Sequence, residues 1–192
     1  NRLASSNPGA LENFDAVQDL ITKVAVNPAN GDVYMGCVSY ILRSQDGGTN
    51  WSTVLNGPAS SSSQVTDVAI TTTGRLYAAF SGTCSNTVDG VWTSTTGNSG
   101  AWTRIAGTGV GVSGWNAQNN DGRIALAIAP SSENIVYALY DNFNSYPAAE
   151  ASLFKWNQSS TSWTDLSTNL PNEPGGSSGN DPFAIQERYD LV

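Results

Sequence analysis

The sequence contains no histidine, only two cysteines and few charged residues, which make up 12% of its 192 positions. Without histidine, this segment cannot supply a Ser-His-Asp triad or a histidine-based zinc site. The cysteines, Cys37 and Cys84, allow at most one internal disulfide, and their spacing fits no zinc or iron–sulfur pattern. They are either a disulfide pair or two small buried residues. We expect no metal and no cofactor.

Positive charge and long apolar runs are also scarce. Lysine occurs only as Lys23 and Lys155, the net charge is −8 and the pI is near 4.2, whereas nucleic-acid binding needs a basic surface. No segment approaches the roughly 18 to 20 apolar residues that span a bilayer. We therefore expect neither nucleic-acid binding nor membrane insertion. Residues 1–10 lack the apolar core of a signal peptide, so we expect a mature or internal segment of a longer protein.

What the sequence does contain is a repeat. Three stretches, 21–36, 65–80 and 123–140, share an alternating strand, a short polar turn and a returning strand with an aliphatic-Tyr pair. A second hairpin follows each stretch, and its last strand is predicted to begin at a tryptophan: Trp51, Trp102 or Trp163. Four strands per repeat, at a period of about 45 to 60 residues, are typical of β-propeller blades. The sequence therefore predicts an all-β fold of three four-stranded antiparallel blades plus the first strand of a fourth.

The repeat also predicts the domain organisation. Residues 1–20 form a lead-in or the end of a preceding blade, and the later units are blade 1 at 21–57, blade 2 at 65–109, blade 3 at 123–171 and a further first strand at 183–192. Natural propellers use about four to eight blades, because a shorter series leaves sheet faces exposed at both ends. We therefore expect a part of a larger propeller, completed by the remaining blades of the same protein or by other chains.

The third turn of the first repeat carries a recognisable motif. It reads SQDGGTNW and matches the pattern S/T-x-D-x-G-x-x-W at Ser44, Asp46, Gly48 and Trp51. The Ser44 hydroxyl and the Asp46 carboxylate are expected to accept hydrogen bonds from turn amides, while Gly48 adopts a positive φ. Trp51 is expected to pack across the base of the hairpin. The corresponding turns of the other repeats lack the aspartate but keep the tryptophan, so we interpret the motif as structural and the three tryptophans as blade-core residues.

With this motif and this repeat, the sequence resembles the Asp-box, or BNR-repeat, β-propellers of sialidases, sortilin-type receptors, xyloglucan-cleaving glycoside hydrolases and large secreted bacterial proteins. The resemblance covers about residues 20–192. Residues 183–192 are similar to a phrase of secreted Bacteroidetes proteins that carry a C-terminal sorting domain. The resemblance implies a bacterial protein that is extracellular or attached to the cell surface.

Blade topology predicts where a ligand would bind. In an up-and-down blade the first and third turns share one face, which would hold the Asp-box, and the longer connections share the opposite, loop-rich face. Long loops on a rigid scaffold are the usual place for binding residues, and aromatic rings beside amides suit sugars. Glycan or protein is the expected partner there. The alternative is that Trp115 and Phe143 fold back over the blade edge. The candidate ligand-face residues are Trp115, Asn116, Asn119, Asp121, Asp141, Phe143 and Tyr146.

Enzymatic functions find less support. A sialidase needs an arginine cluster and a Tyr–Glu pair, and a glycosidase needs two carboxylates across a cleft. Asp121, Asp141 and Glu150 are predicted on the loop-rich face, but their spacing identifies no pair. We therefore predict no catalytic residue and a non-catalytic binding or structural module for adhesion, glycan contact or assembly. The alternative is a fragment of a propeller glycoside hydrolase, similar to a xyloglucanase or sialidase, whose catalytic residues lie mostly outside this chain.

Overall fold

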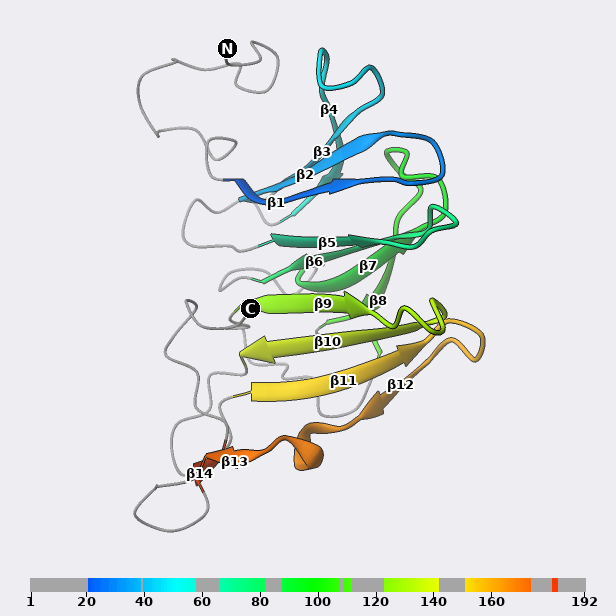
Figure 1. The fold of residues 1–192 in the computed structure, drawn as a ribbon. Coiled ribbons are helices and arrows are strands. Elements are labelled where there is room, and N and C mark those ends of the chain that lie inside the picture. The colour runs from blue at the N-terminus through cyan, green and yellow to red at the C-terminus, as the bar shows by residue number, and fades with distance from the viewer. Residues whose placement is uncertain are drawn as a thin grey trace.

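The computed structural model describes residues 21–38, 40–57, 66–81, 88–107, 109–111, 123–141, 151–173 and 181–182. Within these ranges the chain forms three four-stranded antiparallel sheets, and in each sheet the strands lie side by side in chain order. Figure 1 shows the three sheets stacked one below another, with the first at the top. No helix in the described part of the chain is long and apolar enough to cross a membrane.

The strands of each sheet are short. Sheet 1 consists of β1 (Ile21–Val26), β2 (Val33–Cys37), β3 (Tyr40–Ser44) and β4 (Ser52–Asn56). Sheet 2 consists of β5 (Thr66–Ile70), β6 (Leu76–Phe80), β7 (Gly90–Ser94) and β8 (Thr103–Ala106). Sheet 3 consists of β9 (Ile124–Ile128), β10 (Ile135–Asp141), β11 (Ala151–Asn157) and β12 (Ser162–Asp165). A 3-10 helix, η3 (Ser167–Asn169), follows, and β13 (Asn172–Glu173) then pairs with β14 (Asp181–Pro182).

The predicted all-β fold with three four-stranded antiparallel units is confirmed. Some boundaries differ from the prediction. The last strands of sheets 1 and 2 begin one residue after Trp51 and Trp102, whereas β12 begins one residue before Trp163. Residues 172–173 and 181–182, which lie between the predicted third blade and the predicted further strand, form the β13–β14 pairing. A two-residue ladder is too short to leave a periodic pattern in the sequence, which is why it was missed.

Sheet 2 lies between two apolar cores. On one side, Tyr34 and Ile41 of sheet 1 pack in one cluster with Val68, Leu76 and Phe80 of sheet 2. The alternation of side chains along each strand places the neighbouring positions of sheet 2 on its opposite face. There a second cluster joins sheets 2 and 3; its buried members are Ala79, Val91, Ala106, Ile124, Ala138, Tyr140 and Phe154. Burial of one such aliphatic or aromatic side chain contributes about 1.5–3 kcal/mol, so these two junctions hold the sheets together.

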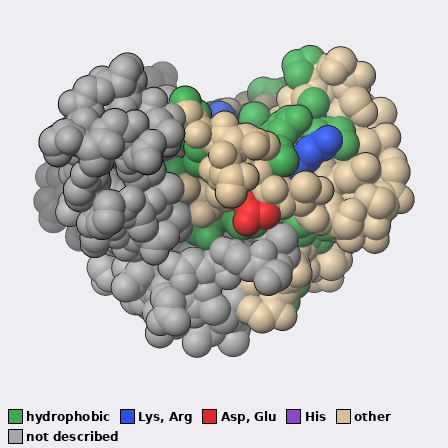
Figure 2. Space-filling model, turned by 90° about the horizontal axis from the view of Figure 1, so that it is seen from below, with side chains coloured by type: hydrophobic (Ala, Val, Ile, Leu, Met, Phe, Trp, Pro, Cys, Tyr) green, Lys and Arg blue, Asp and Glu red, His purple; other side chains and the backbone are tan. Residues whose placement is uncertain are grey.

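The end sheets each have a face that no other four-stranded sheet of the described residues covers. On sheet 1, Ile21, Val24 and Val26 of β1 are exposed large hydrophobic side chains. Figure 2 views the molecule from the side of sheet 3 and shows hydrophobic side chains on the described surface there, with few charged ones among them. The turns that join the first two strands of each sheet lie together on the right of Figure 1. Two of these turns are in contact, because the Thr72 amide donates to the Glu133 carboxylate at 2.8 Å.

Candidate functional site

The turn at residues 44–51 is held by its own side chains. The Ser44 hydroxyl accepts a hydrogen bond from the Gly48 amide at 2.8 Å, and Asp46 Oδ1 accepts one from the Asn50 amide at 2.8 Å. Gly47 and Gly48 both have positive φ, 70° and 92°. The hydrogen bonds from the Asn50 amide and side chain, and from the Ser44 hydroxyl, lower the pKa of Asp46. The Asp46 carboxylate therefore serves as an anchor for the turn.

The three tryptophans predicted as blade-core residues have different surroundings. Trp51 packs against the buried cluster that contains Leu42, and its indole N–H donates to the Gly48 carbonyl of its own turn at 3.0 Å. Trp102 is buried in the core between sheets 1 and 2. Trp163 is half-buried, and its indole N–H donates across the next junction to the Ile105 carbonyl at 2.7 Å. Trp102 and Trp163 thus join neighbouring sheets, whereas Trp51 braces a turn.

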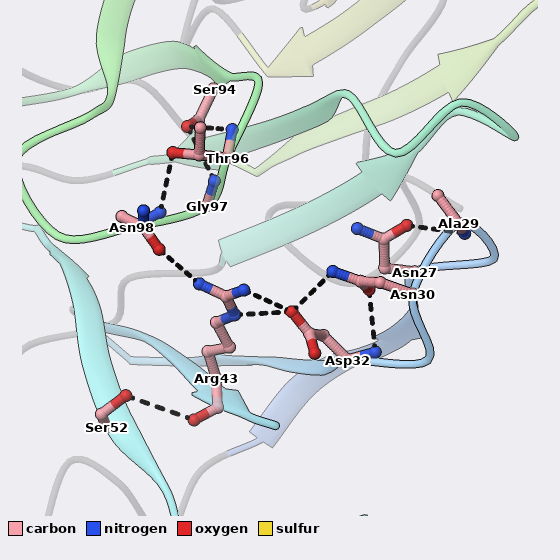
Figure 3. Close-up of polar contacts among 10 residues, drawn as sticks. All are labelled: Asn27, Ala29, Asn30, Asp32, Arg43, Ser52, Ser94, Thr96, Gly97 and Asn98. Carbon is pink, nitrogen blue, oxygen red and sulfur yellow. Dashed lines mark hydrogen bonds and ion pairs between the residues drawn. The ribbon is translucent and has the colours of Figure 1, made fainter. Parts of the chain in front are cut away.

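A buried ion pair lies beside this turn (Figure 3). Arg43 Nε donates to Asp32 Oδ2 at 2.8 Å, and a second guanidinium nitrogen also contacts that oxygen. Asn30 Nδ2 donates to the same oxygen at 2.9 Å. The remaining arm of Arg43 donates to Asn98 Oδ1 at 2.7 Å, and Asn98 belongs to the third turn of sheet 2. The guanidinium also lies over the Tyr34 ring, 5.7 Å from its centroid. The network therefore joins sheets 1 and 2.

Other acidic side chains are also held by the fold. Asp89 pairs with Arg104 at 2.5 Å, and both side chains are largely buried. Asp67 Oδ2 accepts the Leu126 amide of sheet 3 at 2.7 Å, while Asp67 Oδ1 lies 3.6 Å from Lys23 Nζ of sheet 1. No group of three or more His, Cys, Asp or Glu side chains in the described ranges is placed to hold a metal ion. The carboxylates of Asp67 and Asp89 thus hold strands and turns in place.

Two shallow cavities lie near these groups. One, of about 200 Å³, is lined by Arg43, Asp46, Trp51 and neighbouring residues of the same turn. The other, of about 530 Å³, lies between sheets 2 and 3 and is lined by residues that include Trp156 and Trp163. Both combine an aromatic side chain with an arginine, and each of these arginines is already paired with a buried aspartate. Both cavities are open grooves at the edges of sheets.

The structure describes one of the candidate ligand-face residues. Asp141, expected at the start of a long loop, is the last residue of β10; it is buried and opposite Ala151 in the ladder. Its amide donates to the Arg123 carbonyl at 3.0 Å. This position is set by the pairing of β10 with β11, a non-local interaction that the local sequence does not encode. The remaining candidates lie outside the described residues: Trp115, Asn116, Asn119, Asp121, Phe143 and Tyr146.

Sequence reasoning missed the two buried ion pairs. Asp32 follows the polar turn of the first repeat, and Arg43 lies on the third strand, where neither stands out by composition. The one available signal was the hairpin register, which places Tyr34 opposite Arg43 and thereby brings the arginine close to the preceding Asp32. Cys84, the possible partner of Cys37, lies outside the described residues. Cys37 is buried, and burial raises the pKa of its thiol to about 11.

Comparison with known proteins identifies the fold and no more. No protein-family model matches the sequence, and no curated protein matches it. Among solved structures, the GH74 xyloglucanase from Xanthomonas campestris is similar, with a TM-score of 0.51 and 19% sequence identity. The similarity covers 83% of this chain and 24% of the enzyme. A protein of unknown function from Dyadobacter fermentans is similar over 77% of this chain and 42% of its own, with 15% identity and a TM-score of 0.40.

The similarity to the xyloglucanase, together with the three four-stranded sheets, supports a β-propeller-like fold. The chain spans about a quarter of the length of the xyloglucanase. At this level of identity a shared architecture does not carry a shared activity, because function depends on particular side chains placed on the fold.

Proposed function

We propose that this chain is a non-catalytic binding or structural β-propeller module of a secreted or cell-surface protein, which acts in adhesion, glycan contact or assembly. The three sheets are three blades, and further blades of the same protein or of other chains complete the ring. Ligands bind on the loop-rich face, opposite the Asp-box turn. Glycan or protein is the partner, and the chain neither binds nucleic acid nor inserts into a membrane.

The observation that carries this proposal is the use of the described carboxylates. Asp32 and Asp89 neutralise buried arginines, Asp46 closes its own turn, and Asp67 accepts a backbone amide of the next sheet. Glu133 accepts hydrogen bonds from Thr72 in the neighbouring turn. A general acid or nucleophile needs a carboxylate that reaches a substrate. These five groups instead reach other parts of the scaffold, as expected of a module that presents loops.

A glycan array tests the ligand. The labelled chain is applied to a panel of plant, host and bacterial glycans, beside the variant Trp115→Ala. Removal of an aromatic side chain from a binding surface is expected to weaken binding by about tenfold or more. Gln45→Ala is the matched control, because Gln45 is exposed on the Asp-box turn and should not affect a ligand on the other face. Absence of binding by every form would remove the glycan proposal.

The alternative function is part of a propeller glycoside hydrolase, and the observation that favours it is the fold similarity to the xyloglucanase. The complete reading frame separates the two. A second propeller with carboxylates facing this one, together with release of reducing ends from xyloglucan by the whole protein, would favour the hydrolase. Adhesive repeats or a C-terminal sorting domain, with no release of reducing ends, would favour the binding module.

A further inference from the structure

The two junctions between the sheets are built alike. At the first, Tyr34 on the second strand of sheet 1 lies against the third turn of sheet 2, where a methyl group on Gly97 would overlap the Tyr34 hydroxyl. At the second, Tyr77 on the second strand of sheet 2 donates to Gln158 in the third turn of sheet 3 at 3.3 Å. Each sheet therefore presents a second-strand tyrosine to the third turn of the sheet that follows. The junctions are head-to-tail, with one kind of face packed on the other.

The receiving half of such a junction is exposed on sheet 1. Ile21 and Val24 of β1 are 52% and 56% exposed. Their counterparts by ladder register are buried at the internal junctions. Ile21 corresponds to Ile124 in β9, which is 0% exposed, and Val24 corresponds to Val68 in β5, which is 1% exposed. The side chains that bind sheets 2 and 3 to their predecessors thus have apolar equivalents on sheet 1 that lie in solvent.

The presenting half lies on the outer face of sheet 3. Tyr137 and Leu153 are only half-buried, whereas Tyr34 and Tyr77, the equivalents of Tyr137, are 0% exposed within the internal junctions. Leu139, on the same face, packs against Leu170 of its own chain. Figure 2 looks onto this side of the molecule and shows hydrophobic side chains at its described surface. Within the described residues, one copy therefore carries both halves of a junction that none of its own four-stranded sheets completes.

Charge also matches between these two halves. Lys155 is opposite Tyr137 in sheet 3 as Arg43 is opposite Tyr34 in sheet 1. Arg43 reaches the third turn of the following sheet, at Asn98. A docked sheet 1 would bring the turn at residues 44–51, with its exposed Asp46 carboxylate, to the corresponding place near Lys155.

We propose that a second copy of this chain is the occupant: sheet 3 of one copy docks on sheet 1 of another, in the arrangement of the two internal junctions. Head-to-tail interfaces form a ring where the rotation closes, and two copies provide six blades, within the natural range of about four to eight. The inference rests on the propeller-like architecture in the proposed function and needs no ligand, so a negative glycan array leaves it standing.

Sedimentation velocity over a concentration series tests the assembly. The wild-type chain is expected to reach twice its 20.1 kDa mass. Val24→Asp removes the receiving half and Tyr137→Asp the presenting half, and each should raise the dissociation constant about tenfold or more. Val110→Asp is the matched control, since Val110 is also an exposed apolar residue but belongs to neither face. Val26→Asp repeats the test at a second site on sheet 1, and tryptophan fluorescence confirms that each variant is folded.

Mixing distinguishes this head-to-tail assembly from a dimer in which like sheets pair, sheet 1 on sheet 1 or sheet 3 on sheet 3. At a concentration where Val24→Asp and Tyr137→Asp are each monomeric alone, the two variants should associate when combined, because one of the two junctions in the mixed pair is fully wild type. A wild-type chain that stays monomeric at its highest soluble concentration overturns the proposal. A dimer insensitive to Val24→Asp overturns it too, as does one lost through Val24→Asp but kept by folded Tyr137→Asp. Failure of the two variants to associate when mixed would also overturn the proposal.

Discussion

Two tyrosines at the same register position have opposite hydrogen-bonding states. Tyr34 and Tyr77 each lie on the second strand of a sheet and are fully buried, and burial raises the pKa of both phenols. The Tyr77 hydroxyl donates to Gln158, whereas the Tyr34 hydroxyl has no hydrogen-bond partner in the described structure. A buried polar group without a partner destabilises a fold, and a satisfied one contributes modestly. The same substitution should therefore change stability in different directions.

We predict that Tyr34→Phe is neutral or stabilises the chain by up to about 1 kcal/mol, and that Tyr77→Phe destabilises it by about 1 kcal/mol. Phenylalanine keeps the ring under Arg43, so the cation–π contact is retained in Tyr34→Phe. Urea unfolding of the two variants beside wild type gives the comparison. A Tyr34→Phe variant that is less stable than Tyr77→Phe would show that the Tyr34 hydroxyl has a partner in solution.

Asp46 gives the turn at residues 44–51 a pH dependence. Its pKa is lowered, first by the hydrogen bond from the Asn50 amide. Because the folded pKa lies below the unfolded value of about 3.9, the stabilisation is present above that pH and is lost as the pH falls through the folded value. Wild type should unfold at a higher temperature than Asp46→Asn at pH 7, and the difference should shrink below about pH 3.9. Thermal unfolding at both pH values measures it; an unchanged difference would contradict the assignment.

At the scale of the element, the Asp32–Arg43 pair fixes the β1–β2 turn to β3 and reaches the third turn of sheet 2. Both side chains are less than a tenth exposed. Removing one partner of a buried pair leaves an uncompensated charge and costs about 3–5 kcal/mol, whereas removing both costs less. Arg43→Met should therefore be more destabilising than the double variant Asp32→Asn/Arg43→Met.

A double-mutant cycle by urea unfolding measures this coupling, with Asp32→Asn as the second single variant. Strict additivity of the two single substitutions would mean that solvent already screens the pair. The pair Arg104–Asp89 offers an internal comparison, because Arg104 donates to both the backbone carbonyl and the carboxylate of Asp89 within sheet 2.

Local and non-local information explain which elements the sequence predicts. The hairpins are local: alternating strands and turns with glycine at positive φ, such as Gly31 and Gly74, can be recognised within about ten residues. The turn at residues 44–51 is local too, and its hydrogen bonds agree with those expected from Ser44 and Asp46. The Arg43–Asn98 bond joins residues 55 positions apart and follows only from the packing of one sheet on the next.

The candidate site was less predictable than the fold, because it too depends on non-local pairing between strands. Asp141 reads as the first polar residue of a loop, but pairing with Ala151 extends β10 to include it. Whether a polar residue at a strand end is exposed depends on the length of the partner strand, which the local pattern does not contain. The other candidate ligand residues lie on segments outside the described residues and stay predictions.

At the scale of the whole molecule, stability should decrease from the middle sheet outward. Sheet 2 is packed on both faces, and every residue of β6 is buried. By contrast β1 is an edge strand whose side chains are exposed or half-buried. Amides of a strand exchange with solvent through local opening, and the free energy of opening rises with the apolar contacts that must be broken.

Hydrogen exchange followed by mass spectrometry should therefore find β6 protected about tenfold or more above β1 in dilute solution. Sheet 2 would lose its protection only on global unfolding, so low urea should accelerate β1 before β6. Raising the protein concentration adds a second test, since docking of another copy on sheet 1 would slow exchange in β1 and leave β6 unchanged. Equal protection of β1 and β6 in dilute solution would mean that β1 is covered by part of its own chain, and would remove the free surface on which the proposed assembly depends.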